Sequence, residues 1–301
     1  MIRKHARRAV KAAFALALAI PIVLGGTANA KTQATTITIG TKNFTEAFVL
    51  GQLYKQALEA KGYKVAYKEN IAGSELLDTA LKGGKVNFAP EYTGIVALNL
   101  AQAKNVKTAA QNYAAAKAYE EKSGFTLLRQ TPFFDADSFA VLKTTAAKYG
   151  LKTISDLKKV PNLSYGGYPE CDKRITCLLG LKQIYGLTKI KFVQLGTIPV
   201  TKLIDDGTVT GGDIFTTEPA FATGKYVALI DNKHIYGFQN VAPIVSKKLV
   251  AEYGAKFTAV VNAVSAKLTN AAMIAMNKAV AVDKKTPAAV AAAFLKANGL
   301  A

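Results

Sequence analysis

The side chains that could do chemistry in this chain argue against catalysis. There are two histidines, His5 and His234, and only His234 lies beyond the N-terminal segment described below. A Ser-His-Asp triad or a histidine-based metal site would therefore rest on His234 alone. The motifs G-x-S-x-G, H-E-x-x-H and the phosphate-binding P-loop do not occur in the sequence. We therefore expect a protein that is not an enzyme and that uses no metal and no cofactor.

Asp135 and Asp137 form a close pair of carboxylates. A glycosidase needs two carboxylates set across a sugar, and these usually come from separate elements. Two acids spaced i, i+2 in a strand point instead to the same face. We interpret Asp135 as a solvated loop residue and Asp137 as a candidate ligand-facing group.

The two cysteines, Cys171 and Cys177, are six residues apart. In an exported protein a disulfide is the default interpretation of such a pair. In a regular helix, residues six apart are separated by about 9 Å along the axis and face different sides. A bond therefore requires residues 171–177 to form a loop. A metal site is disfavoured because no further Cys or His ligands accompany the pair.

The N-terminal segment has the pattern of an export signal. Residues 1–11 carry five Lys and Arg residues and no acid, and an apolar run follows from Ala12 to Leu24. Small residues at Ala28 and Ala30 form a cleavage site. We predict a signal peptide over 1–30, cleaved after Ala30, and no lipid anchor because no cysteine is near. The expected location is the periplasm; the alternative is an uncleaved membrane anchor.

Length and charge narrow the class of protein further. With 301 residues and 50% hydrophobic residues, the chain can form one large domain or two ordinary ones. The formal net charge of +19 is typical of nucleic-acid binders. However, the lysines are scattered singly from Lys31 to Lys296, without interleaved aromatic residues as stacking platforms. We therefore expect a solvated positive surface and no nucleic-acid partner.

The elements that must position these residues are short strands alternating with amphipathic helices. Asn43 or Thr45 is expected to cap the helix after the first strand, and Ser74 the helix over 75–82. From Lys247 onward the sequence predicts helices. This alternation favours an α/β fold with largely parallel sheets. The strand candidates are 35–40, 63–67, 86–89, 126–129, 139–143, 163–166, 190–195, 213–215, 227–230 and 241–245.

Four segments carry a family resemblance through their order and spacing. They are 40–46 (GTKNFTE), 90–94 (PEYTG), 165–170 (YGGYPE) followed by Arg174, and 215–218 (FTTE). Together they resemble the substrate-binding proteins of osmoprotectant ABC importers. That family binds glycine betaine, choline, carnitine or related quaternary amines. Each motif alone is weak, whereas the ordered set is specific and spans nearly all of the chain after residue 30.

The resemblance implies a type II periplasmic binding protein of the α/β class. Such a protein has two lobes, each a mixed, mostly parallel sheet flanked by helices, joined by two crossover segments. The implied boundaries are 31–134 plus 241–301 for the first lobe and 135–240 for the second. The crossovers are expected near 131–138 and 236–243. The implied partner is an ABC importer permease, to which a monomer delivers its ligand.

The resemblance also implies a ligand site built from aromatic and charged side chains. Lys42 and Arg174 match the basic positions that hold a betaine carboxylate, and Tyr92 matches a cage tyrosine. Phe215 stands where a tyrosine is often found. Ordinary core packing of the aromatic residues and solvation of the basic ones are the structural alternatives. The ligand-binding candidates are Lys42, Asn43, Ser74, Tyr92, Asp137, Arg174, Phe215, Thr216, Thr217 and Gln239.

Two positions depart from the family's aromatic cage. Asp137 and Gln239 stand where aromatic walls are otherwise found, and Tyr168 or Phe134 is a candidate replacement. An acid at position 137 favours a choline-like or other amine ligand over a betaine. An amino acid or an anion on the same scaffold is the alternative solute.

Overall fold

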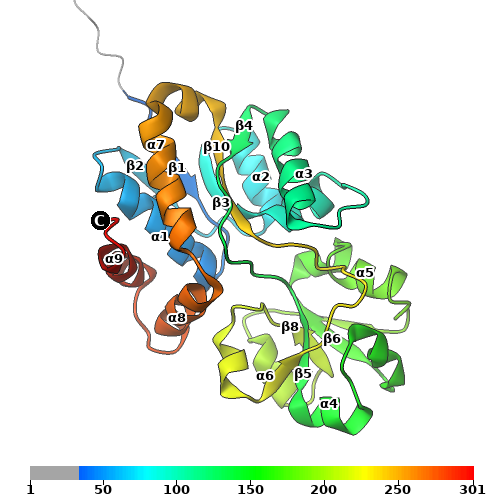
Figure 1. Cartoon of the computed structure of the whole chain (residues 1–301). Coiled ribbons are helices and arrows are strands. Elements are labelled where there is room, and N and C mark those ends of the chain that lie inside the picture. The colour runs from blue at the N-terminus through cyan, green and yellow to red at the C-terminus, as the bar shows by residue number, and fades with distance from the viewer. Residues whose placement is uncertain (1–33) are drawn as a thin grey trace, which may run out of the picture. The chain divides into compact units, whose positions relative to one another are not determined.

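The computed structural model describes residues 34–301, which contain two five-stranded sheets flanked by helices (Figure 1). The predicted signal peptide, 1–30, lies outside the described residues. The first sheet has the order β2-β1-β3-β10-β4 and the second the order β7-β6-β8-β5-β9. The strands of the first sheet are β1 Ile37–Gly40, β2 Val65–Lys68, β3 Phe88–Tyr92, β4 Phe125–Leu127 and β10 Val241–Ser246. Those of the second are β5 Phe139–Leu142, β6 Ser164–Gly167, β7 Lys191–Gln194, β8 Gly211–Asp213 and β9 Tyr226–Ala228.

Each sheet is mixed, as predicted. However, half of the strand pairings in each sheet are antiparallel, whereas mostly parallel pairing was expected. In the first sheet β1 runs parallel to β2 and β3, and β10 runs antiparallel to β3 and β4. In the second sheet β6 runs parallel to β7 and β8, and β5 runs antiparallel to β8 and β9. The antiparallel strands are therefore β5 and β10, through which the chain enters the second sheet and returns to the first.

The helices are distributed between the two sheets. Those around the first sheet are α1 Thr45–Glu59, α2 Ser74–Lys82, α3 Ala109–Glu121, α7 Lys247–Lys267, α8 Asn270–Ala281 and α9 Pro287–Ala297. Those around the second are α4 Lys143–Tyr149, α5 Leu178–Gln183 and α6 Val200–Asp205. A π-helical segment covers Ile95–Leu100, and 3-10 segments cover Ile154–Lys159, Pro169–Lys173 and Pro219–Thr223. We call each sheet with its helices a lobe, the first or the second.

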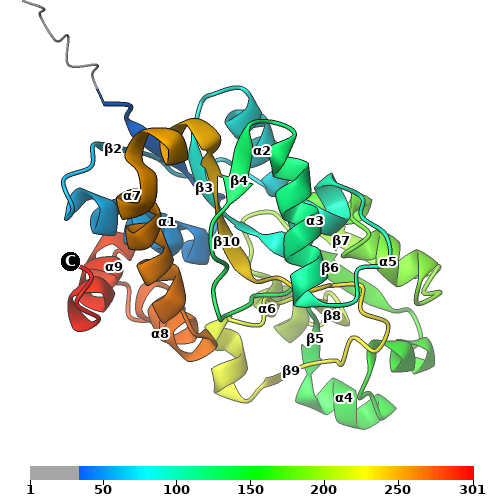
Figure 2. The same ribbon diagram turned by 45° about the horizontal axis from the view of Figure 1, so that its top comes forward.

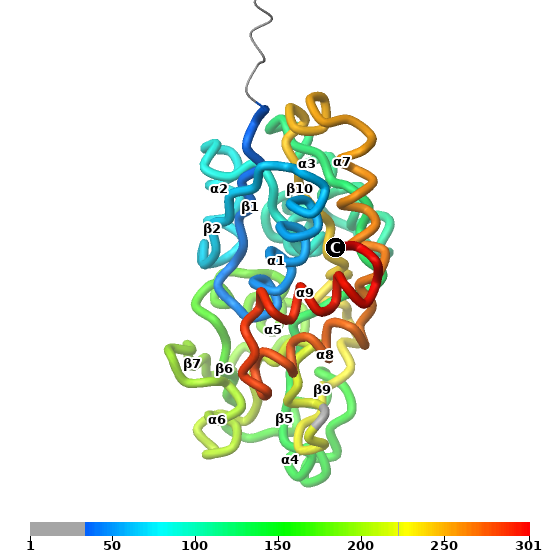
Figure 3. The backbone as a smooth tube through the Cα atoms, turned by 90° about the vertical axis from the view of Figure 1, so that its left-hand side faces the viewer, coloured from blue at the N-terminus to red at the C-terminus, as the bar shows by residue number. Residues whose placement is uncertain are grey.

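Each lobe has its own apolar core on both faces of its sheet. In the first lobe, α1, α7, α8 and α9 cover one face, while α2 and α3 cover the other (Figure 2). Helix α9 lies along α1, which brings the C-terminal helix onto the first helix of the fold (Figure 3). In the second lobe, α5 packs on one face and α6 on the other. None of these four clusters in residues 34–301 draws on both lobes, so polar groups remain to line the space between them.

Two crossover segments connect the lobes and are hydrogen-bonded to each other. Phe134 and Asn240 form an isolated antiparallel bridge, and the Asp135 amide donates to the Gln239 carbonyl at 3.2 Å. The Thr131 amide donates to the Val241 carbonyl at 2.8 Å. The expected i, i+2 strand at Asp135–Asp137 is therefore an irregular crossover rather than part of a sheet.

All ten predicted strands occur, but β8 lies at 211–213 instead of 213–215. The displacement arises from two glycines that resemble a turn in the sequence. A Cβ on Gly212 would lie 2.2 Å from Val200 Cγ2 of α6 and 2.9 Å from the Gly166 carbonyl oxygen. Only glycine lets this strand pass between its neighbour and the helix.

The predicted helix caps at the first two helices are wrong. Phe44 is the N-cap of α1, and Gly73 is the N-cap of α2; neither supplies a capping side chain. Ser74 is instead the first residue of α2, and its hydroxyl accepts a hydrogen bond from Lys42. The side chains of Asn43 and Ser74 therefore do not cap a helix and can make other contacts.

Within residues 34–301, no single helix has both the length and the apolar character needed to cross a bilayer. The bent pair α7 and α8, which meet at 85°, meets those criteria together, by length and composition only.

Candidate ligand-binding site

A cavity of about 40 Å³ lies between the lobes, where the parallel strands end. The loops after β1, β3, β6 and β8 all contribute to its wall, as do the crossover segments. Carboxyl ends of parallel strands are the usual ligand-binding edge of an α/β sheet. The volume has room for roughly three water molecules. The lining residues are Lys42, Asn43, Phe44, Gly73, Ser74, Tyr92, Ile95, Asp135, Asp137, Tyr168, Glu170, Arg174, Phe215 and Gln239.

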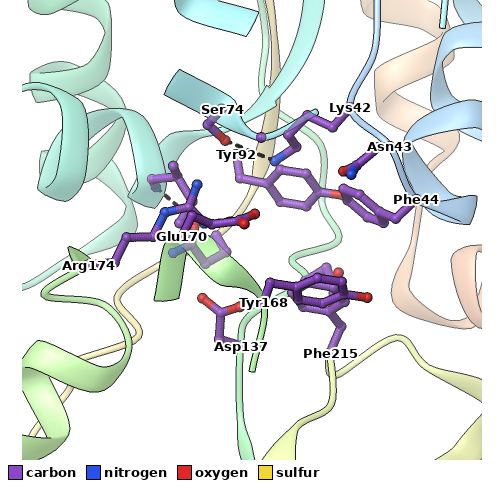
Figure 4. A pocket seen from close by; sticks show the side chains of 14 residues that line it. Lys42, Asn43, Phe44, Ser74, Tyr92, Asp137, Tyr168, Glu170, Arg174 and Phe215 are labelled. Carbon is purple, nitrogen blue, oxygen red and sulfur yellow. Dashed lines mark hydrogen bonds and ion pairs between the residues drawn. The ribbon is translucent and has the colours of Figure 1, made fainter. Parts of the chain in front are cut away.

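Four aromatic rings form a continuous surface along one side of the cavity (Figure 4). In the first lobe, the Phe44 ring centre lies 6.1 Å from that of Tyr92. Phe44 reaches across to Phe215 of the second lobe at 5.4 Å. Phe215 stacks on Tyr168 at 5.9 Å with an interplanar angle of 14°. Aromatic faces carry negative potential, so this surface can hold a cation without hydrogen-bonding it.

Lys42 is held by groups of its own lobe. Its ammonium lies 2.7 Å from Glu91 Oε1, 3.2 Å from Ser74 Oγ and 4.1 Å from the Tyr92 ring centre. Both Lys42 and Glu91 are buried. The charge of Lys42 is therefore already neutralised by a buried partner.

Arg174 is paired across the two lobes. Its Nε and Nη2 donate to the carboxylate oxygens of Glu75 on α2 at 3.0 and 2.8 Å. Its Nη1 lies 4.0 Å from Glu170. This bidentate pair closes one side of the cavity.

Asp135 and Asp137 face the cavity without a basic partner. Among the described residues, no Lys or Arg nitrogen lies within 4.0 Å of either carboxylate, so neither forms an ion pair. Burial raises the pKa of Asp135, and the nearby charge of Glu46 raises it further. Desolvation likewise raises the pKa of Asp137, against the lowering effect of Arg174. A cation entering the cavity would relieve both.

The pKa of Asp137 also depends on that of Asp213, the last residue of β8. Burial raises the pKa of Asp213 well above its ordinary value, and the charge of Asp137 adds to this.

Glu46 fixes the position of the Tyr92 ring. The Tyr92 hydroxyl donates to Glu46 Oε1 at 2.6 Å, and Thr217 Oγ1 donates to Glu46 Oε2, also at 2.6 Å. Asn277 Nδ2 of α8 donates to the same oxygen at 2.8 Å. Burial raises the pKa of Glu46, although these hydrogen bonds lower it. The network joins both lobes behind the aromatic surface.

Eight of the ten predicted ligand-binding residues line the cavity, and two do not. Thr216 and Thr217 lie behind it. Thr216 Oγ1 donates to Asp135 at 3.2 Å, and the Thr217 amide donates to the same oxygen at 3.1 Å. The donors of both residues are therefore used by the protein's own carboxylates.

Gln239 lines the cavity, and its side-chain amide is hydrogen-bonded to the backbone. Its Oε1 accepts from the Ile95 amide at 3.1 Å, and its Nε2 donates to the Tyr236 carbonyl at 2.8 Å. A Cβ on Gly94 would lie 2.6 Å from this amide group. Gln239 thus ties one crossover to the first lobe.

Several lining residues were not among the predicted ligand-binding residues. Asp135, interpreted as solvated, is 4% exposed and faces the cavity. Tyr168, considered as a replacement wall, stacks on Phe215, whereas Phe134 is 46% exposed and does not line the cavity. The other additions are Phe44, Gly73, Ile95 and Glu170. Phe44 and Gly73 are sequence neighbours of predicted residues, which is the signal that could have found them.

Cys171 and Cys177 are joined by a disulfide, with their Cα atoms 5.2 Å apart. Residues 174–177 lie between a 3-10 segment and α5, so the cysteines are not in one regular helix. The disulfide can therefore form, because residues 171–177 do not make up one regular helix. The disulfide lies in the loop that presents Arg174 to the cavity. Among residues 34–301, no group of three or more His, Cys, Asp or Glu side chains could hold a metal ion.

Two lobes joined by paired crossovers, with a small polar and aromatic cavity between them, define a solute-binding protein of the two-lobed class. The chain belongs to the family described as the substrate binding domain of ABC-type glycine betaine transport systems, whose model matches residues 35–297.

Individual proteins agree with this assignment. A glycine-betaine-binding protein of Pseudomonas aeruginosa is 29% identical over 280 residues, which cover 89% of each chain. A crystal structure titled as a glycine betaine/carnitine/choline ABC transporter superposes with a TM-score of 0.71 at 21% identity, covering 88% of this chain and 99% of that one. A choline-binding protein in complex with choline gives a TM-score of 0.67 at 17% identity, covering 88% and 89%. These structures share the two-lobed fold.

Proposed function

We propose that this protein captures a quaternary ammonium or related amine osmolyte and delivers it to the permease of an ABC importer. The observation that carries the proposal is the aromatic surface of Tyr92, Phe44, Phe215 and Tyr168 beside carboxylates that have no basic partner. Membership of the betaine-transport family supports it. Glycine betaine, choline and carnitine are the solutes of this type.

The chemistry of the ligand explains this combination of side chains. A quaternary ammonium has no N–H, so no protein group can accept a hydrogen bond from it. Aromatic faces attract it by roughly 0.5–2 kcal/mol each, the larger value applying when water is excluded. A nearby carboxylate such as Asp137 supplies the counter-charge.

In this proposal the ligand is enclosed by closure of the lobes. Lys42, Phe44 and Tyr92 contact it from the first lobe, and Tyr168 and Phe215 from the second. The proposed lobe boundaries are 31–134 plus 241–301 and 135–240, with the hinge at the crossovers near 131–138 and 236–243. The hydrogen bonds between the crossovers support this hinge, because they let both strands bend together.

The proposed contacts with the ligand come from the cavity wall. Asn43, Ser74 and Arg174 supply polar contacts, and Asp137 supplies negative charge. Gln239 shapes the wall at the hinge. Thr216 and Thr217 serve by holding Asp135 and Glu46 rather than by touching the ligand.

The proposed location is outside the cytoplasm, in the periplasm, after removal of residues 1–30 and without a lipid anchor. The basic and apolar pattern of that segment supports export. The disulfide supports an oxidising compartment. We further propose that the protein works as a monomer and binds no nucleic acid.

An amino acid or an anion is the alternative solute. Both would need free basic groups for a carboxylate or an anionic oxygen. Lys42 and Arg174 line the cavity, but each is already paired with a protein carboxylate. This pairing favours the amine over the anion.

A thermal-shift panel tests the proposal. The purified protein is melted with glycine betaine, choline, carnitine, proline betaine and ergothioneine, and separately with amino acids, phosphate and sulfate. At least one amine should raise the melting temperature in a dose-dependent way, since a ligand that binds only the native state stabilises it. A shift with phosphate, sulfate or an amino acid, and none with any amine, would overturn the amine assignment.

A further inference from the structure

We propose that Glu75 is a specificity-determining residue: it supplies a protein carboxylate that occupies Arg174 and so disfavours ligands that carry a carboxylate of their own. The inference rests on the proposed function and deepens it. It predicts that the site prefers a quaternary amine with net positive charge, such as choline, over a zwitterionic betaine.

The contact between Glu75 and Arg174 uses one of the two edges with which a guanidinium binds a carboxylate. Nε and Nη2 of Arg174 both donate to Glu75, at 3.0 and 2.8 Å. This is the side-by-side geometry with which arginine binds any carboxylate. The remaining nitrogen, Nη1, faces Glu170 at 4.0 Å. Within residues 34–301, Nη1 and the second N–H of Nη2 stay unused, so a ligand carboxylate on that edge would share the guanidinium charge with Glu75 and would lie beside Glu170.

The geometry around Gly73 places this pair next to the cavity, whose wall includes Arg174 but not Glu75. A Cβ placed on Gly73, which lines the cavity, would lie 3.2 Å from Glu170 Oε1, 3.3 Å from Glu75 Oε2 and 3.6 Å from Arg174 Nη2. The three charged groups thus converge on one point of the wall. A side chain at position 73 would push them apart.

Glu75 is also well placed to remain ionised. It lies in the first turn of α2, where the helix dipole favours negative charge. Burial opposes ionisation, but the hydrogen bonds from Arg174 lower the pKa of Glu75. The carboxylate that competes for Arg174 is therefore charged at neutral pH.

Lys42 offers a carboxylate-bearing ligand no easier partner. Glu91 Oε1 accepts from both the Lys42 ammonium and the Tyr92 amide, each at 2.7 Å, and Glu91 is 3% exposed. A ligand would have to displace a buried carboxylate from two donors. The side chain of Glu75 is 47% exposed and can swing into water. Glu75 is therefore the carboxylate with which a betaine competes at Arg174, and mutation can remove it.

The consequence differs between the two kinds of ligand. A cation such as choline uses the aromatic surface and the aspartates that lack a basic partner, and it leaves the Glu75–Arg174 pair intact. A betaine must either exchange its carboxylate for that of Glu75 or share one guanidinium with Glu75 while lying beside Glu170. In both cases the carboxylate of the betaine contributes little to affinity.

The test compares choline with glycine betaine by calorimetric titration of the wild-type protein and of Glu75→Gln. The variant keeps the shape of the side chain but removes its charge, which frees Arg174. We expect the ratio of the glycine betaine Kd to the choline Kd to fall at least about tenfold, the scale of one charge-assisted hydrogen bond.

Two variants serve as controls. Glu59→Gln removes an exposed acid on α1 that pairs only with Lys55, and it should leave the ratio unchanged. Glu170→Gln removes the acid at 4.0 Å from Arg174 and should lower the ratio less than Glu75→Gln does. A ratio that stays within twofold in Glu75→Gln would overturn the inference. An equal fall of the ratio in Glu170→Gln would also overturn the inference, because it would show that any negative charge near the cavity has the same effect.

The outcomes separate this inference from the proposed function. If the wild-type protein binds neither amine, the proposed function fails and this inference fails with it. If the wild-type protein binds choline but Glu75→Gln weakens both ligands equally, Glu75 acts only in closing the lobes. The proposed function would then stand without the specificity role.

Discussion

At the scale of single residues, the cavity has an imbalance of charge. Lys42 and Arg174 are each paired with a glutamate, while Asp135 and Asp137 face the cavity without a basic partner in the described chain. Burying the charge of a carboxylate without a basic partner costs free energy as long as no ligand is bound. A bound cation would restore the balance, so these aspartates favour ligands with positive charge.

Asp137→Asn should weaken choline binding at least roughly tenfold. The variant keeps the size of the side chain and removes its charge, and an ion pair at about 5 Å in a partly buried site has on the order of 3 kcal/mol of Coulomb energy before desolvation. Calorimetric titration measures the change. Asp206→Asn, at an exposed aspartate that is paired with the exposed Lys202, is the matched control. A choline Kd within twofold of the wild-type value would contradict the proposed role of Asp137.

Choline affinity should also rise with pH. The groups around Asp137 are Lys42, Arg174, Glu170 and Asp213, and desolvation raises the pKa of Asp137 in the ligand-free protein. A permanent cation favours the ionised carboxylate, so binding releases a proton and the affinity increases as pH rises from the ordinary aspartate pKa through the raised one. Titrations between pH 5 and 8, in buffers of different ionisation enthalpy, count the protons released. A choline affinity that falls with rising pH would contradict the predicted release of a proton from Asp137.

At the scale of secondary-structure elements, close packing of short strands sets where the loops of the cavity begin. Strand β8 ends at Asp213, two residues before Phe215, and it lies between β5 and β6. Its glycines allow α6 to approach the sheet at Gly212 and the neighbouring strand at Gly211. The position of Phe215 in the aromatic surface therefore depends on this strand.

Gly212→Ala should destabilise the protein by about 2 kcal/mol, a typical effect of overpacking. The new Cβ would meet Val200 Cγ2 at 2.2 Å. Such a loss lowers the melting temperature by roughly 5 °C for a chain of this size. Gly196→Ala is the control, because nothing lies within 4 Å of its Cβ position. Equal melting temperatures for the two variants would argue against tight packing at β8.

The elements that the sequence predicts well are those with local signals. Apolar runs such as Val241–Val245 identify strands because a buried strand needs them wherever it lies. The local signal fails at Gly211 and Gly212, where tertiary packing requires glycine within a strand. It fails also at Ser74, whose hydroxyl is used by Lys42 instead of a helix end.

The candidate site is predictable only where a motif carries it. Lys42, Tyr92 and Arg174 follow from the family resemblance, and all three line the cavity. The Glu75–Arg174 pair joins residues 99 positions apart, so no local pattern indicates it. The burial of Asp135 likewise results from the crossover fold rather than from its neighbours in sequence.

At the scale of the whole molecule, the lobes are held together by polar contacts around the cavity. Besides the Glu75–Arg174 pair, Asn99 Nδ2 of the π-helical segment donates to Thr176 Oγ1 at 2.7 Å. Thr217 donates to Glu46 across the same boundary. Because none of the buried apolar clusters in the described chain spans both lobes, opening costs a few hydrogen bonds and the Phe44–Phe215 contact rather than a large hydrophobic interface.

Asn99→Ala should speed release of a bound amine about fivefold, because one hydrogen bond of roughly 1 kcal/mol is lost from the closed state only. Stopped-flow displacement measures the dissociation rate. Asn232→Ala removes a comparable bond to Ser155 within the second lobe and should leave that rate unchanged. Equal rates for Asn99→Ala and the wild-type protein would show that this contact does not stabilise closure.

The central claim is that the space between the lobes recognises the positive charge of a quaternary amine. The most direct measurement is a calorimetric titration with choline and with 3,3-dimethylbutan-1-ol, its uncharged isostere of nearly the same shape. We predict that choline binds at least about a hundredfold more tightly, since only the cation gains from the aromatic faces and the aspartates. Equal affinity for the two compounds, or no binding of either, would contradict the account.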